Sequence, residues 1–344
     1  MRTDPVDASS LGTKALRERV LVIGARRRRQ GLGAYVAKAF HDAGCDVCAV
    51  VGTSNESAAV AADELRPAGI RATPYAELRA ALREQQPVIV AICSPFRVHR
   101  EQLQLVAEAG CHCLCEKPLW WGPGVESASE TASLVDSFLK AGLLLDLLTQ
   151  WPQTLGTYLE LFPQTAAEPL ERFEMRLSPI ASGRDMVLDA MPHVLSMVWA
   201  LIKAPGEIEK PRAVFGDDGR ELTVDFEYRL GSGLTRVTAR FMTCPEQPRP
   251  AWYGINGRVA ERKIDMSAGY AMRLISGHDP GGRSVALPDP LPMHVRQFVD
   301  EVRGQTGLLN RSGRDDARRE RLIGSVTQLA TLYATACRAA GSHG

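Results

Sequence analysis

The chain has 344 residues, of which 45% are hydrophobic and 24% are charged, and its formal net charge is +1. This composition is typical of a soluble globular protein that is long enough for two domains, each with its own core. A net charge so close to zero gives no electrostatic reason to expect a nucleic acid or an acidic membrane as a partner.

The beginning of the chain carries no targeting signal. Residues 1–19 are polar and contain no apolar core segment, so we interpret them as a flexible leader and not as a signal peptide or anchor. The most apolar later run, residues 143–148, is short and is interrupted by Asp146, which argues against a transmembrane helix.

The eight cysteines indicate a reducing compartment. A chain of this length without an export signal is expected to keep its thiols reduced, which predicts a cytoplasmic location. Cys111, Cys113 and Cys115 alternate and would share one face of a strand. One such row of side chains cannot surround a tetrahedral ion, so we expect no metal site.

The first regular unit is a strand, a glycine-rich connection, a helix and a second strand. Residues 20–23 predict a strand that is buried on both faces, residues 32–43 predict a helix, and residues 46–51 predict the next strand. This is the unit of a dinucleotide-binding fold, in which backbone N–H groups at a helix start hold the pyrophosphate. The predicted cofactor contacts in this connection are Gly24, Arg26, Gly31, Leu32 and Gly33.

The connection departs from the usual glycine spacing, because Arg26 stands where a second glycine is expected. It opens a run of four arginines, Arg26 to Arg29. The run is either a solvated surface loop or a source of guanidinium groups for the cofactor phosphates, and the sequence leaves both interpretations open.

The end of the second strand bears on the choice of cofactor. An NAD-dependent protein usually places a carboxylate there to bind the ribose hydroxyls. This chain has Gly52, Thr53 and Ser54, and the first acid is Glu56. Small hydroxyl residues accommodate a 2′-phosphate, so we favour NADP(H) and regard NAD(H) as possible.

Strands and helices continue to alternate, which predicts a doubly wound parallel sheet over residues 20–120 in a Rossmann domain of residues 20–150. Ligands bind such sheets at the carboxyl ends of the strands, so Gly24, Gly52, Ser94 and Lys117 should line one edge. The expected elements are helix 58–65, extended residues 69–72, helix 75–84, strand 87–92, helix 98–109 and strand 111–115.

Beyond residue 150 the pattern changes to neighbouring strands with few helices, which predicts an α+β domain, residues 151–340, on a mostly antiparallel sheet. We expect a hairpin turn at residues 231–233, and the last helix can pack back on the first domain. The expected elements are strand 171–177, helix 185–202, strands 212–215, 222–230, 234–242, 252–255 and 263–266, and helices 292–303 and 315–339.

Two short patterns supply candidate catalytic groups. Lys117 lies in Glu116-Lys117-Pro118 at a strand end, where the alternative is a solvated ion pair. Asp189 and His193 are four residues apart and share one face of a helix, where the alternative is a core histidine. Pro192 suggests that this helix begins or kinks nearby, which would expose His193 in its first turn.

These residues together resemble the Gfo/Idh/MocA family of NAD(P)-dependent oxidoreductases, over about residues 20–340. The resemblance rests on Ser94-Pro95 followed by His99, on the segment from Ala109 to Pro118 that ends in Glu-Lys-Pro, and on Asp189 with His193. Gln150-Trp151-Pro152 departs from the family, in which many members carry an Asn-x-Arg segment.

The resemblance implies a Rossmann domain followed by an α+β domain whose open sheet forms a homodimer or homotetramer interface. It implies that His193 exchanges the substrate hydroxyl proton, assisted by Lys117 and Asp189. It also implies that Ser94, Pro95, His99, Glu116 and Lys117 contact the cofactor, and that the hydride passes between a substrate carbon and the nicotinamide.

Family members mostly act on sugars, cyclitols and related compounds, so a polyhydroxylated small molecule is the expected substrate. Arg97, Trp121 and Trp151, with Trp120, are expected near the cleft, where they either bind the substrate or pack between domains. Arg184 is either a contact for an acidic substituent or a solvated charge.

Two other functions remain open. One is a non-catalytic dinucleotide sensor, although such a protein need not keep the Lys-Asp-His set. The other is a hydrolase or epimerase that reduces and reoxidises its cofactor within one turnover. Net reduction of the cofactor argues against the latter, and fold alone separates none of them.

Overall fold

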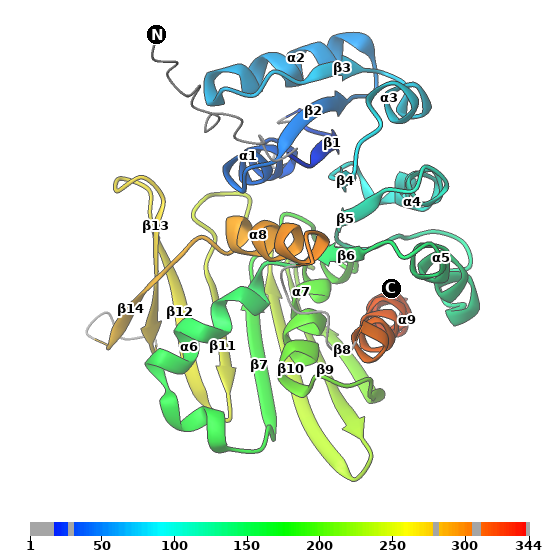
Figure 1. The fold of residues 1–344 in the computed structure, drawn as a ribbon. Coiled ribbons are helices and arrows are strands. Elements are labelled where there is room, and N and C mark those ends of the chain that lie inside the picture. Colours follow the sequence, from blue (N-terminus) through cyan, green and yellow to red (C-terminus); the bar gives the residue numbers. More distant parts are fainter. Residues whose placement is uncertain (1–16, 27–30, 278–281, 305–310, 342–344) are drawn as a thin grey trace, which may run out of the picture.

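The computed structural model describes residues 17–26, 31–277, 282–304 and 311–341. The leader up to residue 16 and the arginines Arg27 to Arg29 lie outside the described residues. The first strand begins at Arg19, and Glu18 just before it forms an ion pair with Arg303 near the other end of the chain. Two sheets lie one above the other in Figure 1.

The first sheet is the predicted doubly wound parallel sheet, with the strand order β3-β2-β1-β4-β5-β6 and parallel pairing throughout. Its order reverses between β1 and β4, which is where such sheets bind ligands.

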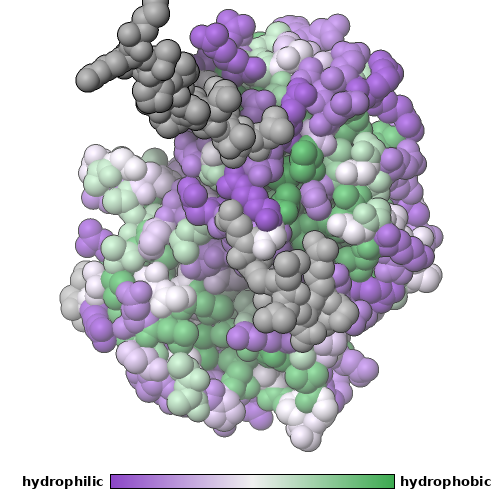
Figure 2. All heavy atoms as spheres, in the orientation of Figure 1, coloured by the Kyte–Doolittle hydropathy of each residue, from purple (hydrophilic) through white to green (hydrophobic). Residues whose placement is uncertain are grey.

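Figure 2 shows hydrophilic residues gathered at the top of the molecule, around α2 and α3. The elements are β1 (Arg19–Ile23), α1 (Gly33–Asp42), β2 (Asp46–Val51), α2 (Asn55–Leu65), β3 (Thr73–Tyr75), α3 (Leu78–Gln85), β4 (Ile89–Ile92), α4 (His99–Glu108), β5 (His112–Glu116), α5 (Ala128–Lys140) and β6 (Leu145–Leu148).

One strand prediction in this domain was wrong. Residues 69–72 are not the strand; β3 begins at Thr73, and the helix expected from Tyr75 begins at Leu78. The reason is a short turn of 3₁₀ helix at Arg66–Ala68, which ends at Gly69 in a left-handed conformation with φ of +80°. Only after this turn does the chain reach the edge of β2.

The second sheet has eight strands in the order β14-β13-β12-β11-β7-β10-β9-β8 and is mostly antiparallel, as predicted. The expected turn joins β9 to β10, where Gly231 takes a φ of +57°. Strands β13 and β14 were not predicted, and neither was β6 of the first sheet. The elements are α6 (Leu155–Leu161), β7 (Arg172–Leu177), α7 (Asp185–Ile202), β8 (Glu207–Phe215), β9 (Glu221–Leu230), β10 (Gly233–Met242), β11 (Ala251–Ile255), β12 (Arg258–Asp265), β13 (Ala271–Ser276) and β14 (Ser284–Leu287).

Helix α7 is the central helix of the second domain. By length and composition it is apolar enough to cross a membrane, yet 61% of it is buried inside the protein, where it packs in the core beside β7 and β10. The helix does not begin at Pro192, because it is continuous from Asp185, so the expectation that His193 lies in its first turn was wrong. Pro192 only removes the N–H that would bond to the carbonyl of Leu188.

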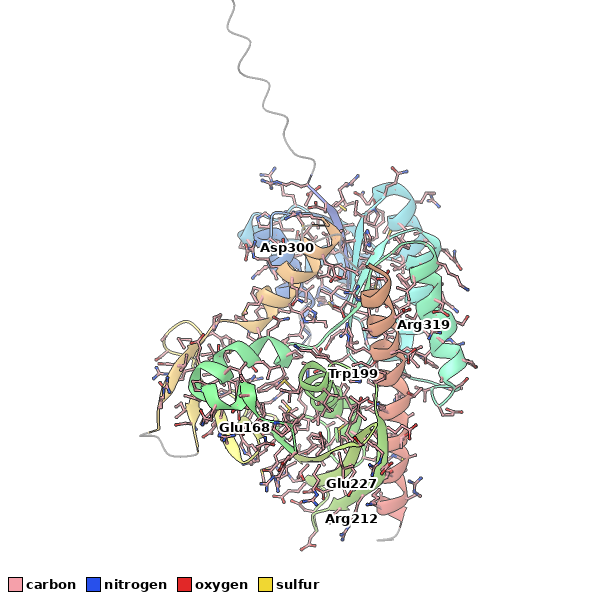
Figure 3. The ribbon with its side chains drawn as sticks, turned by 60° about the horizontal axis from the view of Figure 1, so that its bottom comes forward. Glu168, Trp199, Arg212, Glu227, Asp300 and Arg319 are labelled. Atoms are coloured by element: carbon pink, nitrogen blue, oxygen red, sulfur yellow. The ribbon has the colours of Figure 1, made fainter. Side chains whose placement is uncertain are left out.

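The last two helices tie the domains together. Helix α8 (Pro290–Val302) returns to the first sheet and packs on α1, where Phe298 meets Phe40 edge-on with ring centroids 6.5 Å apart. Helix α9 (Arg311–Gly341) runs beside both domains, and Figure 3 labels Arg319, whose guanidinium binds Asp136 of α5 at 2.6 and 3.1 Å. Helix α8 thus packs on α1 and helix α9 packs on α5, both of which are helices of the first sheet.

Candidate active site

The parallel strands bring the predicted site residues to one edge of the first sheet. Gly24, Gly52, Ser94 and Lys117 follow β1, β2, β4 and β5, and these strands run in the same direction side by side. Their carboxyl ends therefore meet, as the sequence predicted.

Two glycines allow the close backbone approach that a phosphate site needs. A Cβ at Gly33 would lie 2.3 Å from the carbonyl oxygen of Gly24, and a Cβ at Gly24 would lie 2.7 Å from that of Cys93. The end of β1, the start of α1 and the end of β4 are thus in direct backbone contact. The first turn of α1 carries no acidic residue. This arrangement fits a dinucleotide pyrophosphate at the N-terminus of α1.

The end of β2 is a tight turn with an exposed polar surface. A Cβ at Gly52 would lie 2.7 Å from the backbone nitrogen of Ala58. Thr53 and Ser54 are exposed, and the Ser54 hydroxyl accepts a hydrogen bond from the N–H of Ser57 at 3.1 Å, which caps α2. The hydroxyl can still donate to a ligand.

Lys117 and Asp189 form an ion pair between the two domains. Nζ of Lys117 lies 2.9 Å from Oδ1 of Asp189 and 2.6 Å from its backbone oxygen. The other carboxylate oxygen accepts from the N–H of Ile180 at 3.2 Å. Burial raises the pKa of Asp189, but the Lys117 ammonium and its hydrogen bond outweigh burial, so the net shift is downward and the carboxylate stays ionised.

His193 lies one helical turn beyond Asp189. Burial and the nearby charge of Lys117 lower its pKa to about 3, against the opposing effect of Asp189. Its Nδ1 is buried and has no hydrogen-bond partner among the described residues. The imidazole is therefore neutral near pH 7 and has a nitrogen that is free to bind a proton.

Two cavities meet at the Lys117–Asp189 pair, and both are lined by Glu116, Lys117 and Asp189. The larger cavity, which we call the cleft, has a volume of about 570 Å³; the smaller, which we call the inner pocket, has a volume of about 170 Å³. The cleft is also lined by Ser94, Pro95, Phe96, Arg97, Pro118, Trp121, Gly122, Ala181, Asp185, Leu188 and Tyr333. The inner pocket is also lined by Leu32, Leu148, Gln150, Trp151, Leu177, Ser178, Pro179, Ala190, His193, Arg249, Pro250, Ala251 and Arg262.

The predicted cofactor residues form two groups: those that line the cleft or the inner pocket, and those that line neither cavity. Leu32, Ser94, Pro95, Glu116 and Lys117 line a cavity. The other predicted cofactor residues line neither the cleft nor the inner pocket; they are Gly24, Arg26, Gly31, Gly33, Gly52, Thr53, Ser54 and His99.

His99 is fully buried and lies between two of the site's loops. Its Nε2 lies 2.7 Å from the carbonyl oxygen of Ser94, and its Nδ1 lies 3.0 Å from that of Pro118. Burial lowers the pKa of His99, so the ring is neutral and carries one N–H. That N–H can donate to only one of the two carbonyl oxygens, so His99 packs beneath the loops after β4 and β5 and forms a hydrogen bond with one of them.

The predicted substrate residues do not all reach a cavity. Arg97 and Trp121 line the cleft, and Trp151 lines the inner pocket. Trp120 is buried in the core of the first domain, and Arg184 is exposed and lines neither cavity.

Tyr333, Arg249 and Arg262 are among the cavity residues that escaped the sequence interpretation. Tyr333 of α9 meets Trp121 edge-on with ring centroids 5.1 Å apart. Arg249 precedes β11, and Arg262 lies on β12. A signal for Arg262 did exist. It lies two residues after Ala260, which is buried, and residues two apart in a strand point to the same face, here the core side. For Arg249 and Tyr333 we find no such signal.

The described residues contain no group of three or more His, Cys, Asp or Glu side chains that could hold a metal ion. All eight cysteines are free thiols. Cys111, Cys113 and Cys115 are buried in the first domain, where they pack as small apolar side chains.

Comparison with known proteins identifies relatives of the first domain and of the overall fold. Residues 18–145 match the GFO_IDH_MocA model, described as an oxidoreductase family with an NAD-binding Rossmann fold. A 74-residue segment, 22% of this chain, is 38% identical to D-glucoside 3-dehydrogenase of Escherichia coli and spans only 20% of that relative's length.

Two solved structures share the fold over nearly the whole chain. UDP-N-acetylglucosamine 3-dehydrogenase GnnA from Acidithiobacillus ferrooxidans is 21% identical with a TM-score of 0.65, over 93% of this chain and 99% of that one. GenD2 from gentamicin A biosynthesis, in complex with NAD, is 17% identical with a TM-score of 0.66, over 93% and 94%. Over residues 18–145 the chain is thus similar to the Gfo/Idh/MocA oxidoreductase family, and over nearly its whole length it has the fold of these two structures.

Proposed function

We propose that the protein is an NAD(P)-dependent oxidoreductase that acts on a secondary alcohol, or on the corresponding ketone, of a sugar-like substrate. The observation that carries this proposal is the joining of Lys117 and Asp189 across the two domains, with a neutral His193 one turn away, at the edge of the Rossmann sheet. A dinucleotide sensor would need only the sheet edge and the glycines.

The side chains have separable roles. A bound nicotinamide supplies the acceptor for the hydride that leaves the substrate carbon. His193 accepts the hydroxyl proton, because its imidazole is neutral and has a free nitrogen. Lys117 lines the same pocket and donates a hydrogen bond to the substrate oxygen as negative charge develops there. Asp189 orients Lys117 and stabilises the imidazolium that His193 becomes.

The substrate class follows from the relatives and from the aromatic side chains of the cavities. Two of the similar proteins are 3-dehydrogenases, one of a glucoside and one of a nucleotide sugar, which supports a ring hydroxyl as the reacting group. Trp121 in the cleft and Trp151 in the inner pocket offer apolar surfaces that suit a sugar ring.

NADP(H) remains the cofactor that we favour. The turn after β2 presents exposed Thr53 and Ser54 without a carboxylate before Glu56, and half-buried Arg26 follows the neighbouring strand. NAD(H) belongs in every test beside it, since the family model describes an NAD-binding fold and GenD2 was solved with NAD.

The test is the reduction of NADP⁺ and of NAD⁺, followed by absorbance, with a panel of glucosides, cyclitols and sugar acids. Net reduction that depends on the sugar supports the oxidoreductase. Cofactor binding without turnover of any compound supports the sensor. Epimerised or hydrolysed sugar without net reduction supports the transiently redox-active enzyme.

We also propose that the protein works in the cytoplasm as a homodimer or homotetramer. Free thiols at all eight cysteines suit a reducing compartment. The open face of the second sheet is the surface we propose for pairing. Light scattering of the purified chain measures the oligomeric state.

A further inference from the structure

Two arginines of the inner pocket have no role in the chemistry proposed above. Arg262 lies on β12, and its Nη2 donates a hydrogen bond to the backbone oxygen of Arg249 at 3.2 Å. Its guanidinium also lies 4.9 Å from the centre of the Trp151 ring. Arg262 is therefore held on one side by an indole and on the other by the segment that carries Arg249.

Both guanidinium groups lack partners for buried donors. Nε and Nη2 of Arg249 and Nε of Arg262 are buried without a hydrogen-bond partner in the described part of the chain. Neither arginine forms an ion pair with a described carboxylate. Such groups are costly to bury, because a guanidinium N–H that leaves water must be compensated by an acceptor. The pocket thus has a deficit of acceptors beside Trp151.

The charges around the pocket only partly offset the two arginines. Asp189 forms an ion pair with Lys117 and its charge also favours the charged form of Arg249, whose pKa burial nevertheless lowers, while His193 is neutral. The remaining acid is Glu116, whose pKa is raised by burial in opposition to the Lys117 charge. An excess of positive charge therefore faces the space where the substrate hydroxyl would meet His193.

We propose that Arg249 and Arg262 bind an oxyanion, a carboxylate or a phosphate, on the sugar substrate, so that the enzyme acts on acidic sugars. This inference rests on the proposed function and names its substrate class. The planar, forked guanidinium matches a carboxylate or phosphate in geometry as well as in charge. The oxyanion satisfies the buried donors, while the reacting hydroxyl is at His193 and Lys117. A neutral sugar leaves those donors unpaired, which is the kind of contact that discriminates strongly between substrates.

The experiment compares three probes on the protein loaded with reduced cofactor: D-glucuronate, D-glucose 6-phosphate and methyl β-D-glucoside. We expect calorimetry to show at least one acid binding about 100-fold more tightly than the glucoside. Whichever of D-glucuronate and D-glucose 6-phosphate binds more tightly identifies the preferred oxyanion as a carboxylate or a phosphate. Equal affinity for all three probes, or preference for the neutral glucoside, overturns the proposal.

Variants test whether the arginines cause the preference. Arg262→Gln and Arg249→Gln should each reduce acid binding by at least about tenfold and leave glucoside binding nearly unchanged. Arg262→Lys, which keeps the charge but loses the fork, should recover only part of the affinity. Arg273→Gln is the matched control, since Arg273 is an exposed arginine on the adjacent strand β13. Equal loss of acid and glucoside binding in the Gln variants would contradict the assignment.

The same data separate this inference from the proposed function. In one outcome, acid binding depends on Arg249 and Arg262, but none of the probes reduces the oxidised cofactor. This result supports the oxyanion site and contradicts the oxidoreductase proposal. In the other outcome, the glucoside reduces the oxidised cofactor as efficiently as the acids do. This result supports the oxidoreductase proposal and contradicts the oxyanion site. Melting temperatures confirm that each variant is folded before its affinity is compared.

Discussion

Lys117, just after β5, donates hydrogen bonds to both the side chain and the backbone oxygen of Asp189 in the second turn of α7, at 2.9 and 2.6 Å. One residue comes from the Rossmann sheet and the other from the helix at the core of the second domain. The pair lies where the cleft and the inner pocket meet. A displacement of one domain relative to the other therefore changes the position of the ammonium directly.

The first prediction concerns this ammonium. Lys117→Met should lower kcat by about 10²–10⁴-fold, because the group that donates to the substrate oxygen is lost. Cofactor affinity should change little, since the glycine turn that would hold the phosphates lies at another strand end. Lys140→Met, at an exposed position in the last turn of α5, is the control. Undiminished turnover in Lys117→Met would remove Lys117 from the mechanism.

The second prediction concerns the pH dependence of stability through His193. Its pKa of about 3 in the folded protein lies below the ordinary value of 6.5, so the unfolded chain binds a proton that the folded chain does not. Its contribution is present above about pH 6.5 and is lost as the pH falls, by up to about 1.4 kcal/mol per pH unit. When the pH is lowered from about 7 to about 5, the melting temperature of His193→Asn should therefore fall by less than that of the wild type. Parallel curves for the two proteins would show that His193 is not held neutral by burial.

The third prediction concerns the cofactor. Ser54→Asp should weaken NADPH binding more than NADH binding, because a carboxylate there repels a 2′-phosphate. The substitution preserves the cap of α2, since Asp caps helices as well as Ser does. Ser127→Asp makes the same exchange at the cap of α5 and should leave both affinities unchanged. Calorimetry with each reduced cofactor measures the difference, and equal losses would refute our interpretation of the turn after β2.

The fourth prediction concerns the approach of α1 to β1. Gly33→Ala places a Cβ 2.3 Å from the carbonyl oxygen of Gly24, so the helix start must move. We expect a loss of about 1–3 kcal/mol in stability and a weaker affinity for either cofactor. Gly156→Ala in α6 is the control: its Cβ would meet nothing within 4 Å. That change should stabilise the helix by about 1 kcal/mol. Unchanged cofactor affinity in Gly33→Ala would place the phosphates elsewhere.

Prediction from the sequence was strongest where the hydrophobic pattern is local. The buried strand over residues 20–23 and the long helix from Asp185 to Ile202 have the periodicity of their elements, and the structure has both. It failed where a local signal was overridden. The turn that ends at Gly69 delays the start of β3 to Thr73. Helix α7 continues past Pro192 because its residues on both sides of the proline pack in the core.

The sequence by itself predicted the parallel first sheet, the mostly antiparallel second sheet and the edge at which Gly24, Gly52, Ser94 and Lys117 meet. These follow from periodicity and from the rule that parallel strands end on one side. Only the tertiary structure decided that Lys117 pairs with Asp189 and that Arg249 and Arg262 face the same pocket with unpaired donors. Contacts between residues 72 or more positions apart depend on how whole elements pack, and no local pattern in a single chain encodes that packing.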